Sequence, residues 1–247
     1  MNCAWREAAP VALVLLGATI ISAAATAPAA TPADLQAALT ILGAKNRARS
    51  DAELCEATLG QNGKAFRFLE HYWESANYEL LHGAELVWIS MPSPGQADAT
   101  KRLDADGARF TGTPTGKIAA NASGECSNIA ASLNARTFGL DRVTADDQQR
   151  LQMLYRRNGD KDAFRDDNMT TGCMAGAYRK GATDFNAVMR FCECVTQALV
   201  TSGSSAEIDK YLADAGKSDG TNPDALTGQS WFPVANAKLK ACAAIKP

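Results

Sequence analysis

The cysteines constrain the fold of this chain more than any other feature of its sequence. Seven cysteines occur among 247 residues, and only Cys3 lies in the first fifty. The other six are Cys55, Cys126, Cys173, Cys192, Cys194 and Cys242. Six cysteines form at most three disulfide bonds, and such bonds persist in oxidising compartments. The location of the protein therefore decides whether these residues crosslink its fold.

The first thirty residues have the organisation of a secretory signal peptide. Arg6 precedes an apolar run over residues 10–21, which leads into a tract of small residues that ends at Ala30. A positive end, a short apolar centre and an Ala-x-Ala exit are typical of such a segment, whereas a membrane anchor needs about 20 apolar residues. We therefore expect removal of residues 1–30 and a periplasmic or secreted protein with no stable membrane anchor.

Removal of this segment leaves six cysteines, an even number that predicts three disulfide bonds. Six cysteines can be paired in fifteen ways. Residues 183–201 carry apolar side chains at three- and four-residue steps, typical of an amphipathic helix. Cys192 and Cys194 then lie about 200° apart around its axis, so they face different partners and do not bond to each other. The most economical arrangement joins Cys55 to Cys126. Cys173 then bonds to one of Cys192 and Cys194, and Cys242 bonds to the other.

Capping residues and apolar spacing predict a mainly α, disulfide-stapled protein, and the cysteine pairing divides the mature chain near residue 140. Hydrophobic residues at 46% and charged residues at 21% suffice for a core. The region 31–140 is expected to hold helices over 31–43, 50–60 and 64–81. The region 141–247 is expected to be helical throughout, with helices over 144–158, 162–180 and 183–201, one that starts at 204, a loop over 216–230, and one from about 233.

A small β-hairpin insert is expected in the N-terminal half. Residues 86–89 form a short β-prone run before a proline-rich stop, Asp106-Gly107 is a hairpin signal, and residues 111–124 resemble an exposed loop. Displayed loops flanked by aromatic residues often carry interfaces. Trp88, Arg109 and Phe110 are therefore a candidate binding surface, although a solvent-exposed linker of no functional consequence explains the same pattern.

The charges and motifs of the chain favour no cofactor, metal or nucleic acid. Lys and Arg number 25 against 27 Asp and Glu, so the net charge of −2 supplies no field that would attract nucleic acid or anionic lipid. His71 and His82 lack the spacing of a zinc site. A carboxylate pair such as Glu70 and Glu74, one helical turn apart, or Glu79 nearby, would suit an envelope hydrolase. That reading is kept as an alternative.

The cysteine-bearing segments of the C-terminal half carry a resemblance to a known family. The run Cys173-Met-Ala-Gly-Ala-Tyr178, then Cys192-x-Cys194 and the terminal Cys242, resembles small helical, disulfide-bonded periplasmic immunity proteins that neutralise peptidoglycan-cleaving toxins of rival bacteria. The resemblance covers about the last eighty residues. It implies an inhibitor or immunity function through binding of another protein, without catalysis. A structural component of the cell envelope is a further alternative.

Overall fold

The computed structural model describes residues 31–92, 95–98, 101, 115–217 and 224–245. The predicted signal peptide lies outside these residues, so export remains a prediction. The helices of the described part are α1 (Pro32–Leu59), α2 (Ala65–Ala76), α3 (Tyr78–Ile89), α5 (Thr115–Asn134), α6 (Ala145–Asn158), α7 (Lys161–Arg179), α8 (Phe185–Val200), α9 (Ser205–Lys217), α10 (Asp224–Thr227) and α11 (Phe232–Cys242), with short 3₁₀ turns at Gly60–Gly63 and Leu140–Arg142. This mainly helical fold confirms the expected class.

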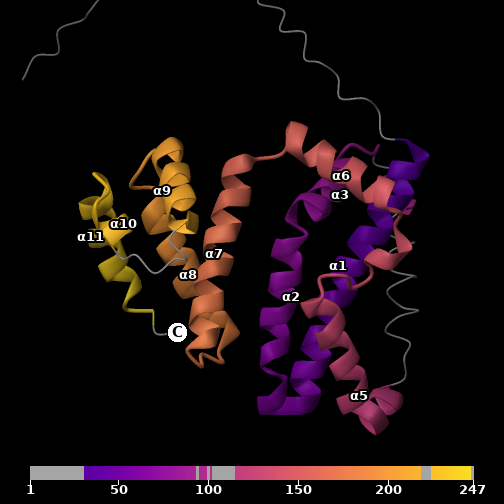
Figure 1. Ribbon diagram of the computed structural model, residues 1–247. Helices are drawn as coiled ribbons and strands as arrows, with labels where there is room; N and C mark the ends of the chain where they lie inside the picture. The colour runs from indigo at the N-terminus through magenta and orange to yellow at the C-terminus, as the bar shows by residue number, and fades with distance from the viewer. Residues whose placement is uncertain (1–30, 93–94, 99–100, 102–114, 218–223, 246–247) are drawn as a thin grey trace, which may run out of the picture.

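Two groups of helices meet where α2 packs against α7 (Figure 1). In the first group α1 contacts α2, α3, α5 and α6, and α3 packs closely against α6. In the second group α8 contacts α7, α9 and α11. Phe68 of α2 is fully buried and packs with Met174 of α7 and Val188 of α8. A side chain from the first group of helices therefore forms part of the core of the second group. The division of the mature chain into two regions near residue 140 stays a prediction. α6 follows that point in the sequence but packs with α1 and α3, which precede it.

The first helix is longer than the sequence suggested. Thr31 caps it as expected, because its side chain accepts a hydrogen bond from the backbone N–H of Asp34 and the Asp34 carboxylate accepts one from the backbone N–H of Thr31. The prediction of two separate helices over 31–43 and 50–60 was wrong, because one helix spans both segments. Ala44, Ala48 and Ala52 form one continuous buried edge, and this packing outweighs the cost of about 1 kcal/mol of a glycine inside a helix.

The segment around Asn77 departs most from expectation. A single helix over 64–81 was wrong, because the Asn77 side-chain amide donates to the Trp73 carbonyl (2.9 Å) and α2 ends there. A strand over 86–89 was also wrong, because these residues belong to α3, whose buried side chains recur at helical spacing: Leu80, Leu81, Ala84 and Val87. No β-strand occurs in the described ranges, and the Asp106-Gly107 hairpin signal lies outside them.

The close contact of α3 with α6 depends on Gly83. A Cβ atom at this position would lie 2.1 Å from the carbonyl oxygen of Leu151, a distance that no real side chain shows. The glycine lets the two backbones approach, and Tyr78 and Tyr155 pack edge-to-face one turn away, with ring centroids 5.6 Å apart. This contact fixes α6 to the first group of helices.

The helices expected in the C-terminal half are confirmed. Thr144, Asp160 and Asp184 cap α6, α7 and α8, and the capping box formed by Ser204 and Glu207 starts α9. Two predicted loops were partly wrong. α5 already begins at Thr115 inside the loop expected over 111–124, and the short α10 lies inside the loop expected over 216–230.

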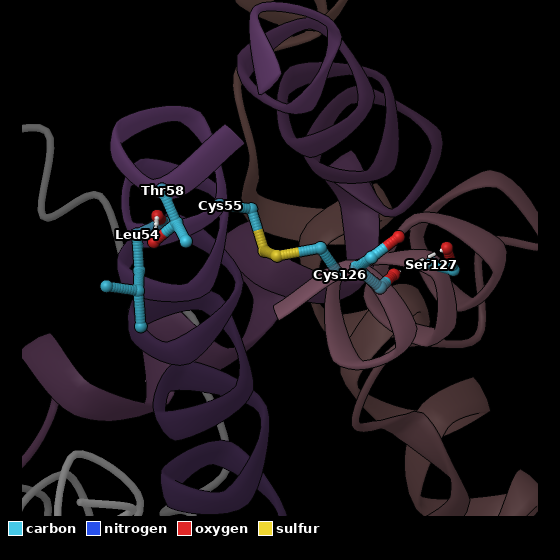
Figure 2. The surroundings of a disulfide bond; sticks show 6 residues. Leu54, Cys55, Thr58, Cys126 and Ser127 are labelled. Carbon is cyan, nitrogen blue, oxygen red and sulfur yellow. Dashed lines mark hydrogen bonds between the residues drawn. A yellow bond between two sulfur atoms is a disulfide. The ribbon is translucent and has the colours of Figure 1, made fainter. Parts of the chain in front are cut away.

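Three disulfide bonds crosslink these helices, and they agree with the arrangement expected from the sequence and decide the two pairings that it left open. Cys55 of α1 bonds to Cys126 of α5 (Figure 2), Cys173 of α7 to Cys192 of α8, and Cys194 of α8 to Cys242 of α11. Cys192 and Cys194 therefore face opposite sides of α8, as their angular separation requires. Three disulfides fit an extracellular or otherwise oxidising location.

Candidate functional site

A groove of about 460 Å³ lies where α2, the end of α5 and α7 meet, and it is called the junction groove below. Its volume falls within the range of sites that bind small molecules or short segments. The lining residues are Leu69, Tyr72, Ser75, Ala76, Leu133, Asn134, Arg136, Asn168, Thr171, Gly172 and Ala175. Apolar and hydrogen-bonding side chains are thus mixed along a surface to which both groups of helices contribute.

Two hydroxyl groups of the groove are held by ionisable side chains behind them. The Ser75 hydroxyl donates to the Asp167 carboxylate (2.6 Å), and the Thr171 hydroxyl is hydrogen-bonded to Nε2 of His71 (2.9 Å). Burial lowers the pKa of His71, so its imidazole is neutral near pH 7. Because Asp167 accepts from Ser75 while His71 bonds to Thr171, the four groups form two separate pairs that join α2 to α7. They do not form the hydroxyl–imidazole–carboxylate chain of a nucleophilic enzyme.

Arg136 is placed on the rim of the groove by the way in which α5 ends. The backbone N–H of Thr137 donates to the Ser132 carbonyl and that of Arg136 to the Leu133 carbonyl, which is the Schellman arrangement. Arg136 occupies the position that glycine usually takes, with a φ of 63°. Its side chain is exposed and makes no ion pair with any residue that the structure describes.

The carboxylates proposed for a hydrolase lie elsewhere. Glu70 is buried, with 3% of its side chain exposed, and its two oxygens lie 3.5 Å from Arg49 and 3.6 Å from Arg67. Burial, followed by the charge of Glu74, raises the pKa of Glu70 to about 6, against the opposing effect of the two arginines. Glu74 itself lies 3.4 Å from Arg49. This cluster fixes α1 against α2 and does not line the groove.

The carboxylates of α3 are also occupied by cations. Glu79 accepts hydrogen bonds from Nε and Nη2 of Arg156 of α6, and Glu85 accepts one from Lys45 of α1 (2.9 Å). His82 lies 2.6 Å from the other oxygen of Glu85. The hydrogen bond from His82, followed by Lys45, lowers the pKa of Glu85 to about 2, so this carboxylate stays ionised. These contacts hold α3 against its neighbours.

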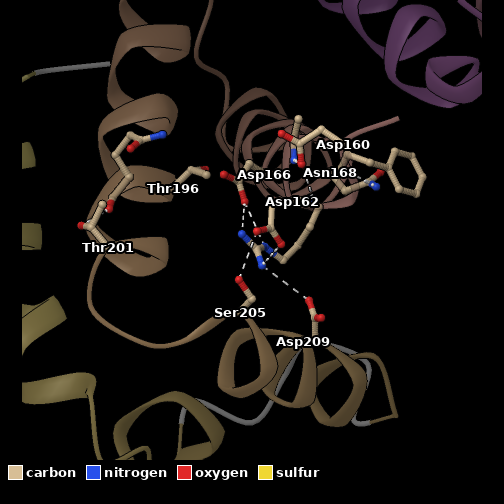
Figure 3. A network of polar contacts seen from close by, with 12 residues as sticks. Asp160, Asp162, Asp166, Asn168, Thr196, Thr201, Ser205 and Asp209 are labelled. Carbon is tan, nitrogen blue, oxygen red and sulfur yellow. Dashed lines mark hydrogen bonds and ion pairs between the residues drawn. The ribbon is translucent and has the colours of Figure 1, made fainter. Parts of the chain in front are cut away.

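A second polar cluster joins α7 to α9 and has a structural explanation. Arg165 contacts the carboxylates of Asp162 (2.9 Å), Asp166 (2.7 Å) and Asp209 (3.8 Å), and Ser205 donates to Asp162 (Figure 3). Only 10% of the Arg165 side chain is exposed. A buried guanidinium surrounded by acids neutralises them and positions α9. In the part of the chain that is described, no group of three or more His, Cys, Asp or Glu side chains could hold a metal ion.

The binding surface expected from the sequence is only partly visible. Trp88 lies near the end of α3, half-buried, and its carbonyl accepts a hydrogen bond from the Gln96 side chain (3.2 Å). Arg109 and Phe110 lie outside the described residues, so this surface stays a prediction. Sequence reasoning missed the junction groove and Arg136, since no motif marks a place where three distant segments meet.

Comparison with protein-family models, with curated proteins and with solved structures finds no match for this chain. No helix in the described ranges is long and apolar enough to cross a membrane.

Proposed function

We propose that this protein is exported to the bacterial periplasm or beyond and binds another protein, with an inhibitor or immunity function preferred. The observation that carries the proposal is the junction groove. It is a concave surface on a disulfide-crosslinked scaffold, and it presents hydrogen-bonding groups without a carboxylate or imidazole in its lining. Such a surface is suited to recognition.

The scaffold supports this role because both walls of the groove are held firmly. The Cys173–Cys192 bond ties α7 to α8, and the Cys55–Cys126 bond ties α1 to α5, the helix that ends at the groove. A surface that is ordered before its partner arrives loses little conformational entropy on binding. The resemblance of the last eighty residues to periplasmic immunity proteins points to the same function.

The hydrolase alternative has less support from the described residues. Glu70 is buried between two arginines, Glu79 is bound by Arg156, and neither lines the groove. A glycoside hydrolase needs two carboxyl groups on opposite sides of an accessible substrate. We therefore prefer binding over hydrolysis, and no observation favours a purely structural envelope component.

Site-specific photo-crosslinking in the producing bacterium tests the proposal. A photoreactive phenylalanine derivative at Asn168, on the rim of the groove, should form a covalent adduct with one partner protein. The same residue at Lys210, exposed on α9, serves as the matched control and should give none. The partner, identified by mass spectrometry and purified, should then bind the mature chain in calorimetry and lose its own activity on binding. Adducts that are absent at Asn168, or equal at both positions, would contradict the proposal.

A further inference from the structure

We propose that the junction groove binds an extended polypeptide segment that carries an acidic side chain, whose carboxylate pairs with Arg136. This inference rests on the proposed function, because it names the chemistry of the segment that a partner protein inserts. Three observations support it: the charge of the rim, the accessible backbone of α7, and the hydrogen-bonding groups between them.

The charge of the rim comes from Arg136. Two arginines near α2 are paired, since Arg49 contacts Glu70 and Glu74, and Arg67 contacts Glu53 (3.1 Å) and Glu70. Burial raises the pKa of Tyr72 and the charge of Arg179 of α7 opposes that rise, but Arg179 does not line the groove. Arg136 makes no ion pair within the described ranges, and every other side chain that lines the groove is uncharged. A guanidinium recognises a carboxylate through two parallel hydrogen bonds.

The negative charge behind the groove determines the orientation of the ligand. Asp167 lies behind Ser75 and already accepts the hydroxyl hydrogen bond of that residue. A ligand carboxylate next to Asp167 would be repelled, so it belongs at the Arg136 rim. The uncharged part of the segment then runs along α7.

The surface of α7 inside the groove accommodates a main chain. A Cβ atom at Gly172 would meet no other atom within 4 Å, so packing within the protein does not require glycine at this position. Glycine inside a helix costs stability but leaves the backbone open to close approach by another chain. Ala76 of α2 and Ala175 of α7 also line the groove and have short side chains.

The hydrogen-bonding groups match those of a peptide. Asn134 and Asn168 carry amides that both donate and accept, as peptide groups do, although one N–H of Asn168 already donates to the Phe164 carbonyl (2.9 Å). The Tyr72 hydroxyl is buried at the groove without a hydrogen-bond partner in the part of the protein described. This hydroxyl is closed to solvent, so the contacts to a bound segment come from the two asparagine amides.

Titration of the ¹⁵N-labelled mature protein with three probes tests this inference by NMR. The probes are the blocked tripeptides acetyl-Ala-Glu-Ala-amide and acetyl-Ala-Gln-Ala-amide, and sodium acetate. Both peptides should shift the amide signals of Asn134, Asn168 and Thr171. The Glu peptide should bind about three- to fivefold more tightly than the Gln peptide, the difference that an exposed ion pair supplies. Acetate should bind more weakly than either peptide, because it makes no main-chain contacts.

Two charge variants separate Arg136 from a general effect of positive charge. Arg136→Gln should abolish the preference for the Glu peptide and leave the affinity for the Gln peptide unchanged. Arg157→Gln, which removes an exposed charge from α6, should preserve the preference. The inference is overturned by shifts that avoid the groove, by equal affinity for the two peptides, or by acetate binding as tightly as the Glu peptide, which would indicate a site for free anions.

The outcomes for the groove chemistry and for the proposed function are distinguishable. A partner that crosslinks at Asn168 while the peptides fail would leave the function in place and refute the acidic-segment chemistry. Peptide binding without a crosslinked partner would refute the function and leave the groove as a peptide site.

Discussion

Replacement of Glu70 by glutamine should stabilise this protein at neutral pH. The carboxyl group of Glu70 is almost completely buried, and burial raises its pKa to about 6 from a reference value of 4.5. A carboxyl whose folded pKa lies above its unfolded pKa binds more protons in the folded state between these two values. Ionisation of Glu70 therefore destabilises the folded protein as the pH rises from about 4 to about 7.

The size of this effect follows from the two pKa values. The difference between about 6 and 4.5 corresponds to about 2 kcal/mol of unfolding free energy above pH 7. Glutamine has nearly the same shape and does not ionise, so Glu70→Gln should be about 1–2 kcal/mol more stable than the natural sequence at pH 7.5 and equal to it at pH 4. The arginines keep partners in the variant, because Arg49 also contacts Glu74 and Arg67 also contacts Glu53.

Urea unfolding followed by circular dichroism at pH 4, 5, 6, 7 and 8 measures this difference directly. Subtraction of the two curves removes the titration of every group that does not interact with Glu70. Glu53→Gln is the matched control, since its side chain is 54% exposed and its ion pair with Arg67 should change stability by less than about 1 kcal/mol at any pH. A Glu70→Gln variant less stable than the natural sequence at pH 7.5 would refute the reasoning, since the arginines would then favour the carboxylate more than burial penalises it.

Glycine substitutions should act in opposite directions, as thermal unfolding can show. Gly83→Ala should destabilise by about 1–3 kcal/mol, because its Cβ would overlap the Leu151 carbonyl, whereas Gly172→Ala should stabilise by about 0.5–1 kcal/mol. Loss of the α1–α5 disulfide should lower the free energy of unfolding by about 4 kcal/mol, because its cysteines are 71 residues apart and close a long loop. Loss of the α7–α8 disulfide, with a separation of 19, should lower it by about 3 kcal/mol. Equal losses in urea unfolding would contradict the loop-entropy argument. Alanine at both Arg109 and Phe110 should weaken partner binding by more than about 1 kcal/mol at an unchanged melting temperature; normal binding in calorimetry would remove this surface from consideration.

Much of the helical content could be predicted from the sequence because helix ends are specified locally. Thr31 and Thr144 accept hydrogen bonds from backbone N–H groups three residues ahead, and residue type alone indicates such caps. Helix geometry also excluded a bond between Cys192 and Cys194. It left open which of them joins Cys173 and which joins Cys242, and the tertiary structure decides that point. The errors over residues 43–50 and 86–89 arose where long-range packing outweighed local preference, at Ala48 and at Val87.

The sequence by itself determined a mainly helical chain, the caps of most helices and the cysteines that crosslink them, because each of these depends on contacts between near neighbours or on the geometry of one helix. Only the tertiary structure decided that Arg136, Asn168 and Tyr72 line one groove, and that Glu70 is buried while Glu53 is exposed. Those properties depend on which helix faces meet, and burial then changes both the pKa of a carboxyl and the ligand that a surface can bind.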